Sequence, residues 1–180
     1  MGKKSTKISN NKVFITGGGG FIGSHLCERL LVNNNKVVIY DSGHRNAIIH
    51  TGLLKHPDLK FVKGDVLDFD KVRSSMRGCN LVIHCAAIAG INTVIKKPIM
   101  TMKINLFGTY NVIEAAISNK VEKFIGFSTS EVYGPYIYKG SEDDLTTQGE
   151  VGKTRWTYAV SKLAAEHLVH CYKDEYGIDI

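Results

Sequence analysis

The sequence contains no long run of apolar residues: none reaches the ~18 residues that a membrane-spanning helix requires. Proline is scarce, with three residues in 180, and charged residues make up 22%, so the chain lacks the composition of a disordered protein. The basic, polar N-terminus has no apolar segment of the kind found in secretory signals. These absences exclude a membrane span and lead us to expect a folded cytoplasmic protein with no membrane partner.

The cysteines form no C-x-x-C pair. There are four of them, at Cys27, Cys79, Cys85 and Cys171. We expect all of them to be small buried apolar side chains in a reducing compartment. His167 and His170 lie close to the last cysteine, but no carboxylate or cysteine pair completes a ligand set, so we predict no bound metal.

The positive charge of the chain is not gathered into a binding stripe. The formal net charge is +6, and four of the 23 basic residues fall at Lys3, Lys4, Lys7 and Lys12. The others are scattered and are not interleaved with aromatic residues, which disfavours nucleic-acid binding. A mildly basic protein suits an anionic small-molecule substrate. We expect residues 1–10 to form a flexible tail.

Short apolar runs alternate with longer helical patterns along the rest of the chain. The apolar runs predict strands at 12–16, 36–40, 59–64, 80–86 and 122–128, and the opening of a sixth at 177–180. The helical patterns cover 20–32, 69–76, 99–118 and 156–176. This alternation predicts an α/β fold with a doubly wound parallel sheet, as one domain over 11–180. The polar stretch 134–155 is predicted to be a functional loop.

Glycines at a fixed spacing follow the first predicted strand. Gly17, Gly20 and Gly23 give G-x-x-G-x-x-G at the start of a helix, where the backbone can approach a pyrophosphate and free N–H groups face it. Asp41 ends the second strand, where a carboxylate can bind the ribose hydroxyls and repel a 2′-phosphate, which favours NAD over NADP. Arg45 could instead pair with a 2′-phosphate.

Further residues at strand ends are candidates for the same cofactor site. Asp65 follows the third strand, where it could meet the adenine amino group or cap the next helix, and the pattern does not separate these alternatives. Ala86 and Ala87 end the fourth strand. Their small side chains would let a flat cofactor lie against the backbone, but they would also simply pack well.

Hydroxyl groups and a carboxylate follow the fifth predicted strand. Ser128, Thr129 and Ser130 stand where ligands bind in open α/β sheets, outside the carboxyl ends of the strands. A hydroxyl there could bond a substrate oxygen that gains or loses a proton. Glu131 adds a possible acid or base.

Tyr158 and Lys162 lie four residues apart in the last helical pattern, so both side chains are predicted on one helix face. An ammonium beside a phenol favours the phenolate, so we expect Lys162 to lower the pKa of Tyr158 and make it a proton acceptor. With the glycine turn upstream, the pattern indicates oxidation and reduction of an alcohol.

At these residues the chain resembles the extended short-chain dehydrogenase/reductase family, the NAD-dependent nucleotide-sugar epimerases, dehydratases and decarboxylases. TGGGGFIGSHL is similar to the family's TGGAGFIGSHL, and the likeness runs from about Lys12 to Ile180. The resemblance implies a Rossmann fold, bound NAD, a nucleotide-diphosphate sugar substrate and a catalytic triad of Thr129, Tyr158 and Lys162. It further implies dinucleotide contacts from Gly17, Gly20, Phe21, Ile22, Gly23, Asp41, Asp65 and Val66. Asn105 matches a family asparagine that we interpret as structural.

The resemblance also bears on the reaction and the assembly. It implies transient oxidation of the sugar at C4 by an epimerase or dehydratase. Dehydratases of the family carry Thr-Asp-Glu, whereas Thr129-Ser130-Glu131 and Arg155-Trp156 are similar to UDP-glucuronate decarboxylases and some 4-epimerases. A non-catalytic NAD(P)-binding regulator of the same fold is the other alternative. The family's substrate-binding half lies mostly beyond residue 180, so we expect a truncated chain, and a homodimer in the full-length form.

Overall fold

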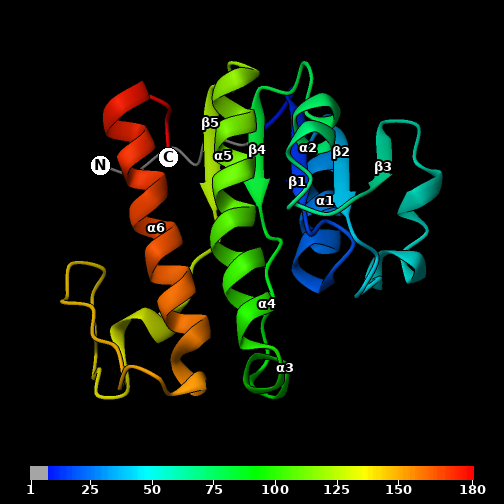
Figure 1. Cartoon of the computed structure of the whole chain (residues 1–180). Helices are drawn as coiled ribbons and strands as arrows, with labels where there is room; N and C mark the ends of the chain where they lie inside the picture. Colours follow the sequence, from blue (N-terminus) through cyan, green and yellow to red (C-terminus); the bar gives the residue numbers. More distant parts are fainter. Residues whose placement is uncertain (1–7) are drawn as a thin grey trace.

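A computed structural model describes residues 8–180 and confirms the predicted fold class. Its sheet has five parallel strands in the order β3-β2-β1-β4-β5. The strands are β1 (Lys12–Thr16), β2 (Lys36–Asp41), β3 (Leu59–Lys63), β4 (Leu81–His84) and β5 (Lys123–Gly126). All of them point the same way, so their carboxyl ends gather at the lower edge of the sheet in Figure 1.

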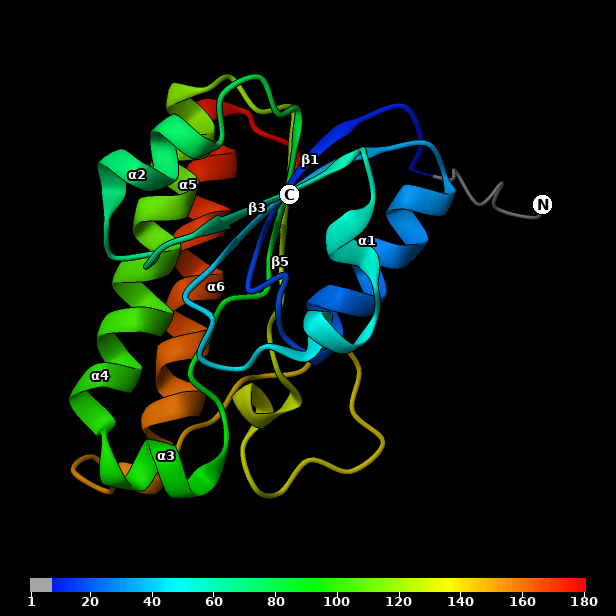
Figure 2. The ribbon, with the colours of Figure 1, turned by 90° about the vertical axis from the view of Figure 1, so that its right-hand side faces the viewer.

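Helices cover both faces of this sheet (Figure 2). They are α1 (Phe21–Val32), α2 (Phe69–Ser75), α3 (Ile91–Lys96), α4 (Pro98–Met102), α5 (Gly108–Ser118) and α6 (Thr157–Tyr176). Short 3₁₀ helices occupy Ala47–His50, Leu53–Lys55, Ser130–Tyr133 and Thr154–Trp156. Helix α1 lies on one face, and α2, α5 and α6 lie on the other.

The core is divided by the sheet into two apolar layers. Alternate residues of a strand point to opposite faces, so in β1 Phe14 packs with the α5 and α6 side, whereas Val13 and Ile15 pack with the α1 side. All three side chains are fully buried. Burial on both faces explains why the central strands read as continuous apolar runs, while the edge strand β3 is only partly buried.

The predicted helix at 99–118 is divided into three segments. It consists of α4, a π-helical turn at Lys103–Phe107 and α5. The π turn contains the buried Asn105, whose side chain bonds to Ile88 and Ser161 outside the helix. A local widening of this kind leaves the apolar spacing nearly helical, so the sequence pattern does not reveal it.

The two ends of the described chain both contact the sheet region. Asp179 pairs with Lys123 in a parallel bridge, and the Phe124 amide donates to the Asp179 carbonyl at 2.8 Å, beside β5 where a sixth strand was predicted to open. Of the predicted tail, residues 1–7 lie outside the described part. Ile8 packs on the α1-side core, and its carbonyl accepts a hydrogen bond from Asn35 at 3.0 Å.

Candidate active site

The glycine turn joins β1 to α1 through a very close backbone approach. Gly17 has φ +69°, and a Cβ there would lie 2.7 Å from the Ala86 nitrogen. A Cβ on Gly23 would lie 2.4 Å from the Gly17 carbonyl oxygen, so this glycine lets the helix pack on the turn. Gly20 precedes the first helical residue, and its added Cβ would meet only the Gly17 oxygen, at 3.3 Å. The turn therefore presents bare backbone and a helix N-terminus.

A cavity of about 590 Å³ opens beside this turn, at the carboxyl ends of the strands. Seven predicted cofactor residues line it: Gly17, Gly20, Asp41, Asp65, Val66, Ala86 and Ala87. Predicted residues outside its lining are Phe21, Ile22, Gly23, Tyr158 and Lys162. Phe21 and Ile22 are exposed at the start of α1. The size and the backbone lining suit part of a dinucleotide.

Sequence reasoning missed other residues of this lining. Among them are Ser42, His44, Thr93, Lys97, Met100 and Ile104. Ser42 and His44 lie within three residues of Asp41, so the predicted position of Asp41 could have indicated them. The other four come from the segment around α3 and α4, and nothing in the local pattern shows that this segment folds back over the sheet edge.

Asp41 is buried and holds the turn together. Its Oδ2 accepts a hydrogen bond from the Gly19 amide at 2.9 Å, and its Oδ1 accepts one from the Gly43 amide at 2.7 Å. A carboxylate can accept about four hydrogen bonds, so two of its positions stay available to ribose hydroxyls. Arg45 lies beside the same cavity and donates to the Ala89 carbonyl at 3.3 Å.

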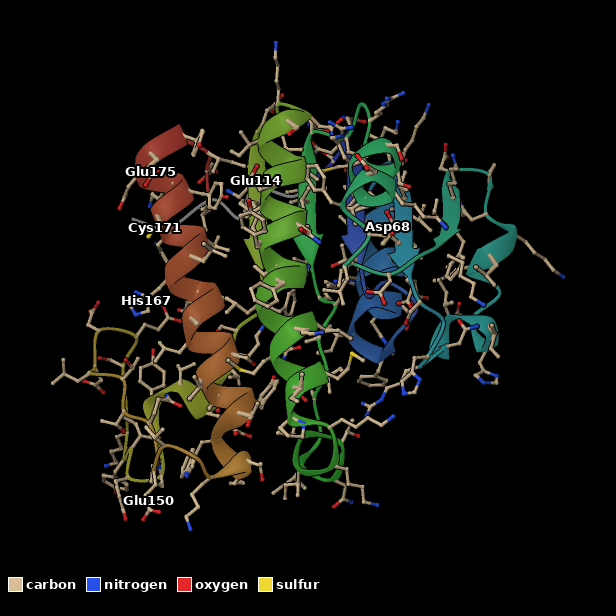
Figure 3. The ribbon with its side chains drawn as sticks, in the orientation of Figure 1. Asp68, Glu114, Glu150, His167, Cys171 and Glu175 are labelled. Atoms are coloured by element: carbon tan, nitrogen blue, oxygen red, sulfur yellow. The ribbon has the colours of Figure 1, made fainter. Side chains whose placement is uncertain are left out.

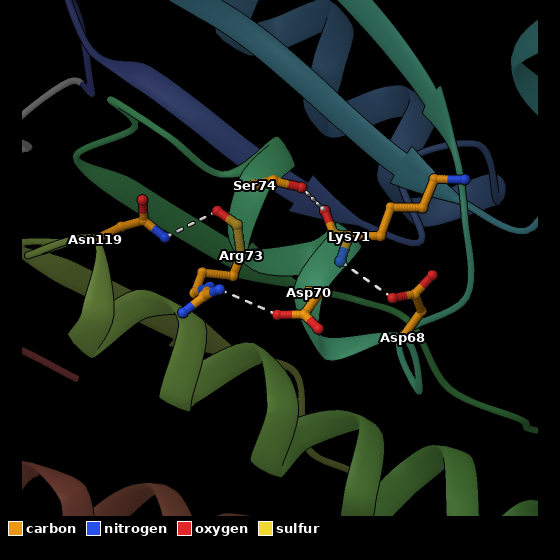
Figure 4. Close-up of polar contacts among 6 residues, drawn as sticks. All are labelled: Asp68, Asp70, Lys71, Arg73, Ser74 and Asn119. Carbon is orange, nitrogen blue, oxygen red and sulfur yellow. Dashed lines mark hydrogen bonds and ion pairs between the residues drawn. The ribbon is translucent and has the colours of Figure 1, made fainter.

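The two alternatives for Asp65 are resolved in part. The cap of α2 is Asp68, whose Oδ1 accepts from the Lys71 amide at 3.1 Å, as Figure 4 shows. Asp65 instead accepts from the Leu67 amide at 3.0 Å and lines the cavity. The capping alternative for Asp65 is therefore wrong, because the loop runs three residues further before the helix begins.

The hydroxyls after β5 face the start of α6. The Thr129 side chain lies near enough to the Tyr158 phenol to lower its pKa, and the Thr129 Oγ1 accepts a hydrogen bond from the Glu131 amide at 3.3 Å. Ser128 donates to Glu166 at 2.6 Å, one turn beyond Lys162 on α6. The fold thus brings Thr129 and Tyr158, 29 positions apart in the sequence, close together.

The pKa of Tyr158 is shifted opposite to the direction predicted from Lys162. Burial raises this pKa, the hydrogen bond with Thr129 lowers it, and the negative charge of Glu131 raises it further. The net shift is upward, because the half-buried phenol loses solvation that the phenolate needs. Lys162 is not among the groups that move it.

Lys162 is almost completely buried, and burial lowers the pKa of its ammonium. Its charge acts on the carboxyl end of β4, where it lowers the pKa of His84 and opposes the rise in the pKa of Cys85. The Lys162 ammonium therefore acts electrostatically on the residues at the carboxyl end of β4. This placement suits a group that binds a sugar hydroxyl of the cofactor.

One prediction about the cysteines is wrong. Cys27 and Cys79 are buried and Cys85 is partly buried, but Cys171 is exposed on α6, where Figure 3 labels it with His167. The amphipathic spacing of α6 allowed either face for this position. Within residues 8–180, no three His, Cys, Asp or Glu side chains form a group that could hold a metal ion. Over the same residues, no helix is both long and apolar enough to cross a membrane.

Comparison with known proteins identifies relatives of the chain. A UDP-N-acetyl-alpha-D-glucosaminuronate decarboxylase of Bacillus cytotoxicus is 37% identical over 158 residues, which are 87% of this chain and 48% of the relative. A dTDP-D-glucose 4,6-dehydratase of Dictyostelium discoideum is 32% identical over 94% of this chain and 42% of its own length. The chain thus spans about half the length of these curated relatives.

Solved structures agree with the fold. A UDP-N-acetylglucosamine 4-epimerase from Methanobrevibacter ruminantium, in complex with UDP-N-acetylmuramic acid, has a TM-score of 0.85 at 26% identity, over 96% of this chain and 53% of that one. A UDP-glucose 4-epimerase from Brucella ovis in complex with NAD has a TM-score of 0.80 at 27% identity, over 93% and 49%. The sequence also matches the family model over residues 13–180. The chain therefore belongs to the NAD dependent epimerase/dehydratase family.

Proposed function

We propose that this chain is the cofactor-binding part of an NAD-dependent enzyme that oxidises a nucleotide-diphosphate sugar transiently at C4. The proximity of Thr129 to Tyr158 on the helix that carries the buried Lys162, together with the cavity at the glycine turn, carries this proposal. The solved relatives support the substrate class, since one is in complex with UDP-N-acetylmuramic acid and another with UDP-glucose and NAD.

The residues of the cavity fit NAD. The turn at Gly17 and Gly20 and the N-terminus of α1 would hold the pyrophosphate, because bare backbone and free amides face it. Asp41 would accept hydrogen bonds from the adenosine ribose, and Ala86 and Ala87 would leave room for the cofactor beside β4. Bound oxidised NAD would supply the hydride acceptor and a positive charge near the phenol.

Three side chains of the site carry out proton transfer and bind the reacting oxygen. Tyr158 takes the proton of the sugar hydroxyl as the alcohol becomes a ketone and returns it on reduction. Thr129 holds the same oxygen and, through its hydrogen bond, favours the phenolate. Lys162 keeps a buried positive charge beside the β4 end. Because burial alone raises the pKa of Tyr158, the phenol becomes an efficient base only with an added positive charge nearby.

The reaction after oxidation has two candidates. Epimerisation returns the ketone to an alcohol of either configuration, as in the epimerases of the same fold. Decarboxylation of a uronic acid sugar is the second, and it is favoured by Thr129-Ser130-Glu131 and by the decarboxylase relative at 37% identity. Ser130 stands where the dehydratases have an acid, which disfavours dehydration.

Turnover of defined sugars tests the proposal. The protein is incubated with UDP-, GDP- and dTDP-sugars, including uronic acids, and products are identified by mass and NMR. Tyr158→Phe should lower turnover by orders of magnitude while NAD still binds. Tyr176→Phe, an exposed tyrosine at the far end of α6, is the matched control and should leave turnover unchanged. Full turnover in Tyr158→Phe would overturn the catalytic assignment, and NAD binding without turnover of any sugar would favour a regulator.

We also propose a homodimer through α5 and α6. These neighbouring helices carry exposed apolar side chains at Tyr110 and Val160. A second copy would bury such surface. Light scattering after size exclusion checks the mass in solution, and a monomer at all concentrations would contradict the proposal.

A further inference from the structure

A line of buried polar groups runs through the core behind the cofactor cavity. The Thr16 hydroxyl of β1 lies 2.6 Å from His84 Nδ1, and His84 Nε2 lies 2.9 Å from the Thr109 hydroxyl of α5. All three side chains are buried. Buried polar groups are almost always hydrogen-bonded in folded proteins, and the distances between these three side chains allow them to satisfy one another.

The hydrogen bond made by Thr109, at the α5 end of this line, determines which nitrogen of His84 carries the proton. The Thr109 hydroxyl donates to the Asn105 carbonyl at 2.6 Å, so its oxygen can only accept from His84, which places the ring proton on Nε2. His84 Nδ1 is then an acceptor and takes the Thr16 hydroxyl proton. The opposite arrangement would leave the Thr16 proton with no acceptor among its partners in residues 8–180.

The other end of the line reaches the cofactor cavity. The Thr16 oxygen accepts a hydrogen bond from the Ala86 amide at 3.3 Å, and Ala86 lines the cavity and lies against Gly17. Two residues further on, Asn105 holds both the amide and the carbonyl of Ile88. The segment between β4 and α3, which lines the cavity, is therefore held at two points. Thr16 and Asn105 hold it, and neither of their side chains lines the cavity.

We propose that Thr16 and His84 are positioning residues for the cofactor: His84, neutral and protonated on Nε2, fixes the Thr16 hydroxyl so that its oxygen holds the Ala86 backbone in place. The inference rests on the proposed function, since it assumes that the cavity takes NAD. Thr109 contributes by accepting the Nε2 proton.

The electrostatic surroundings keep the ring neutral. Burial lowers the pKa of His84 to about 3, and the nearby Lys162 ammonium lowers it as well. A protonated ring would carry a second proton on Nδ1, facing the Thr16 oxygen, which already accepts from Ala86. A neutral ring is thus required both by the local charge and by the order of the hydrogen bonds.

The proton order is tested first, without any cofactor. Long-range ¹H–¹⁵N correlation NMR of the histidine rings shows which nitrogen carries the proton, and we expect Nε2 for His84. Thr109→Val removes the acceptor of that proton but leaves Nδ1 as the acceptor of the Thr16 proton, so the Nε2 tautomer should persist. An Nδ1 proton on His84 in the unaltered chain would overturn the proposal.

The positioning role is tested with Thr16→Val, which is nearly isosteric but cannot accept from Ala86. Hydrogen exchange of the Ala86 amide should become faster, and NAD binding measured by calorimetry should weaken about tenfold, the effect of one lost hydrogen bond of ordinary strength. Thr16→Ser restores the hydroxyl and should rescue both. Thr101→Val, a buried threonine whose hydroxyl donates to the Lys97 carbonyl just before α4, is the matched control and should change neither.

The outcomes distinguish a failure of the positioning role from a failure of the proposed function. Unchanged Ala86 exchange and unchanged NAD affinity in Thr16→Val would overturn the positioning role and leave the proposed function intact. A failure of the unaltered chain to bind NAD would overturn both the proposed cofactor and the positioning role, whereas the tautomer result would stand. If Thr16→Val only lowers the stability, Ala86 exchange should change together with that of the whole core, which also counts against a specific role.

Discussion

Glu131 and Arg155 form an ion pair, with 2.9 Å between the carboxylate Oε2 and the guanidinium Nη1. It joins the residues after β5 to the residues before α6, across the loop 134–155, which lies at the lower end of the sheet in Figure 1. The Arg155 guanidinium also lies over the Trp156 ring, 5.2 Å from its centroid. Glu131 was predicted as an acid or base, and the structure anchors its carboxylate near Tyr158.

The ion pair should add little to stability. Both side chains are roughly two fifths exposed, at 39% and 44%, and a solvated pair of this kind is worth about 1 kcal/mol or less. A double-mutant cycle with Glu131→Gln and Arg155→Met, followed by urea unfolding, measures the coupling. A coupling energy above about 2 kcal/mol would contradict this reading and indicate a desolvated pair.

Tyr158 should ionise at higher pH than an ordinary tyrosine in the absence of NAD, because burial and Glu131 both raise its pKa. The difference between the ultraviolet titrations of the unaltered chain and Tyr158→Phe isolates its phenolate. Glu131→Gln removes a negative charge and should move this transition to lower pH, and Thr129→Val should move it to higher pH. A transition below the usual range for tyrosine would show that Lys162 controls the phenol after all.

The stability of the chain should fall as the pH drops below about 6.5, through His84. Its pKa is about 3 in the folded state, so at pH 5 the unfolded chain binds a proton that the folded chain does not. Linkage then lowers the unfolding free energy by up to about 1.4 kcal/mol per pH unit, until the folded ring itself titrates. Urea unfolding at pH 7 and pH 5 measures the loss. Thr109→Val, which removes the hydrogen-bond partner of the ring Nε2, should change this dependence.

Asp41→Asn should weaken NAD binding about tenfold or more, because hydrogen bonds to a charged group are worth about 1.5–3 kcal/mol. The preference for NAD over NADP should shrink as well, since a neutral amide no longer repels a 2′-phosphate and Arg45 remains beside the cavity. Calorimetry with both dinucleotides gives the ratio. Asp70→Asn, an exposed change on α2, is the control. An unchanged ratio would remove Asp41 from cofactor selection.

Gly17→Ala should damage the protein more than Gly52→Ala, although both glycines have positive φ. At Gly52 the added methyl meets nothing within 4 Å, so only the backbone strain of about 1–2 kcal/mol applies. At Gly17 the methyl would also lie 2.7 Å from the Ala86 nitrogen, and backbone cannot move aside cheaply. Unfolding free energies of the two variants check the difference. Equal losses would mean that the β1–β4 approach is looser than the structure shows.

Part of the cavity lining was predictable from local sequence. Gly17, Gly20 and Asp41 could be placed because a turn after a strand demands particular residues at fixed spacing, and all three line the cavity. Residues from α3 and α4, such as Thr93 and Met100, could not be placed, since their role depends on how a distant segment folds back. The prediction that Lys162 lowers the pKa of Tyr158 was wrong for a related reason: spacing gives the helix face but not the burial.

The sequence by itself determined the strand and helix order, the parallel sheet and the glycine turn, because periodicity and turn chemistry act over a few neighbouring residues. Tertiary structure alone decided the π turn at Asn105, the proximity of Thr129 and Tyr158, and the partners of the hydrogen bonds at His84. Those features depend on groups far apart in the chain, whose burial removes water and leaves each polar atom only the partners that the fold supplies.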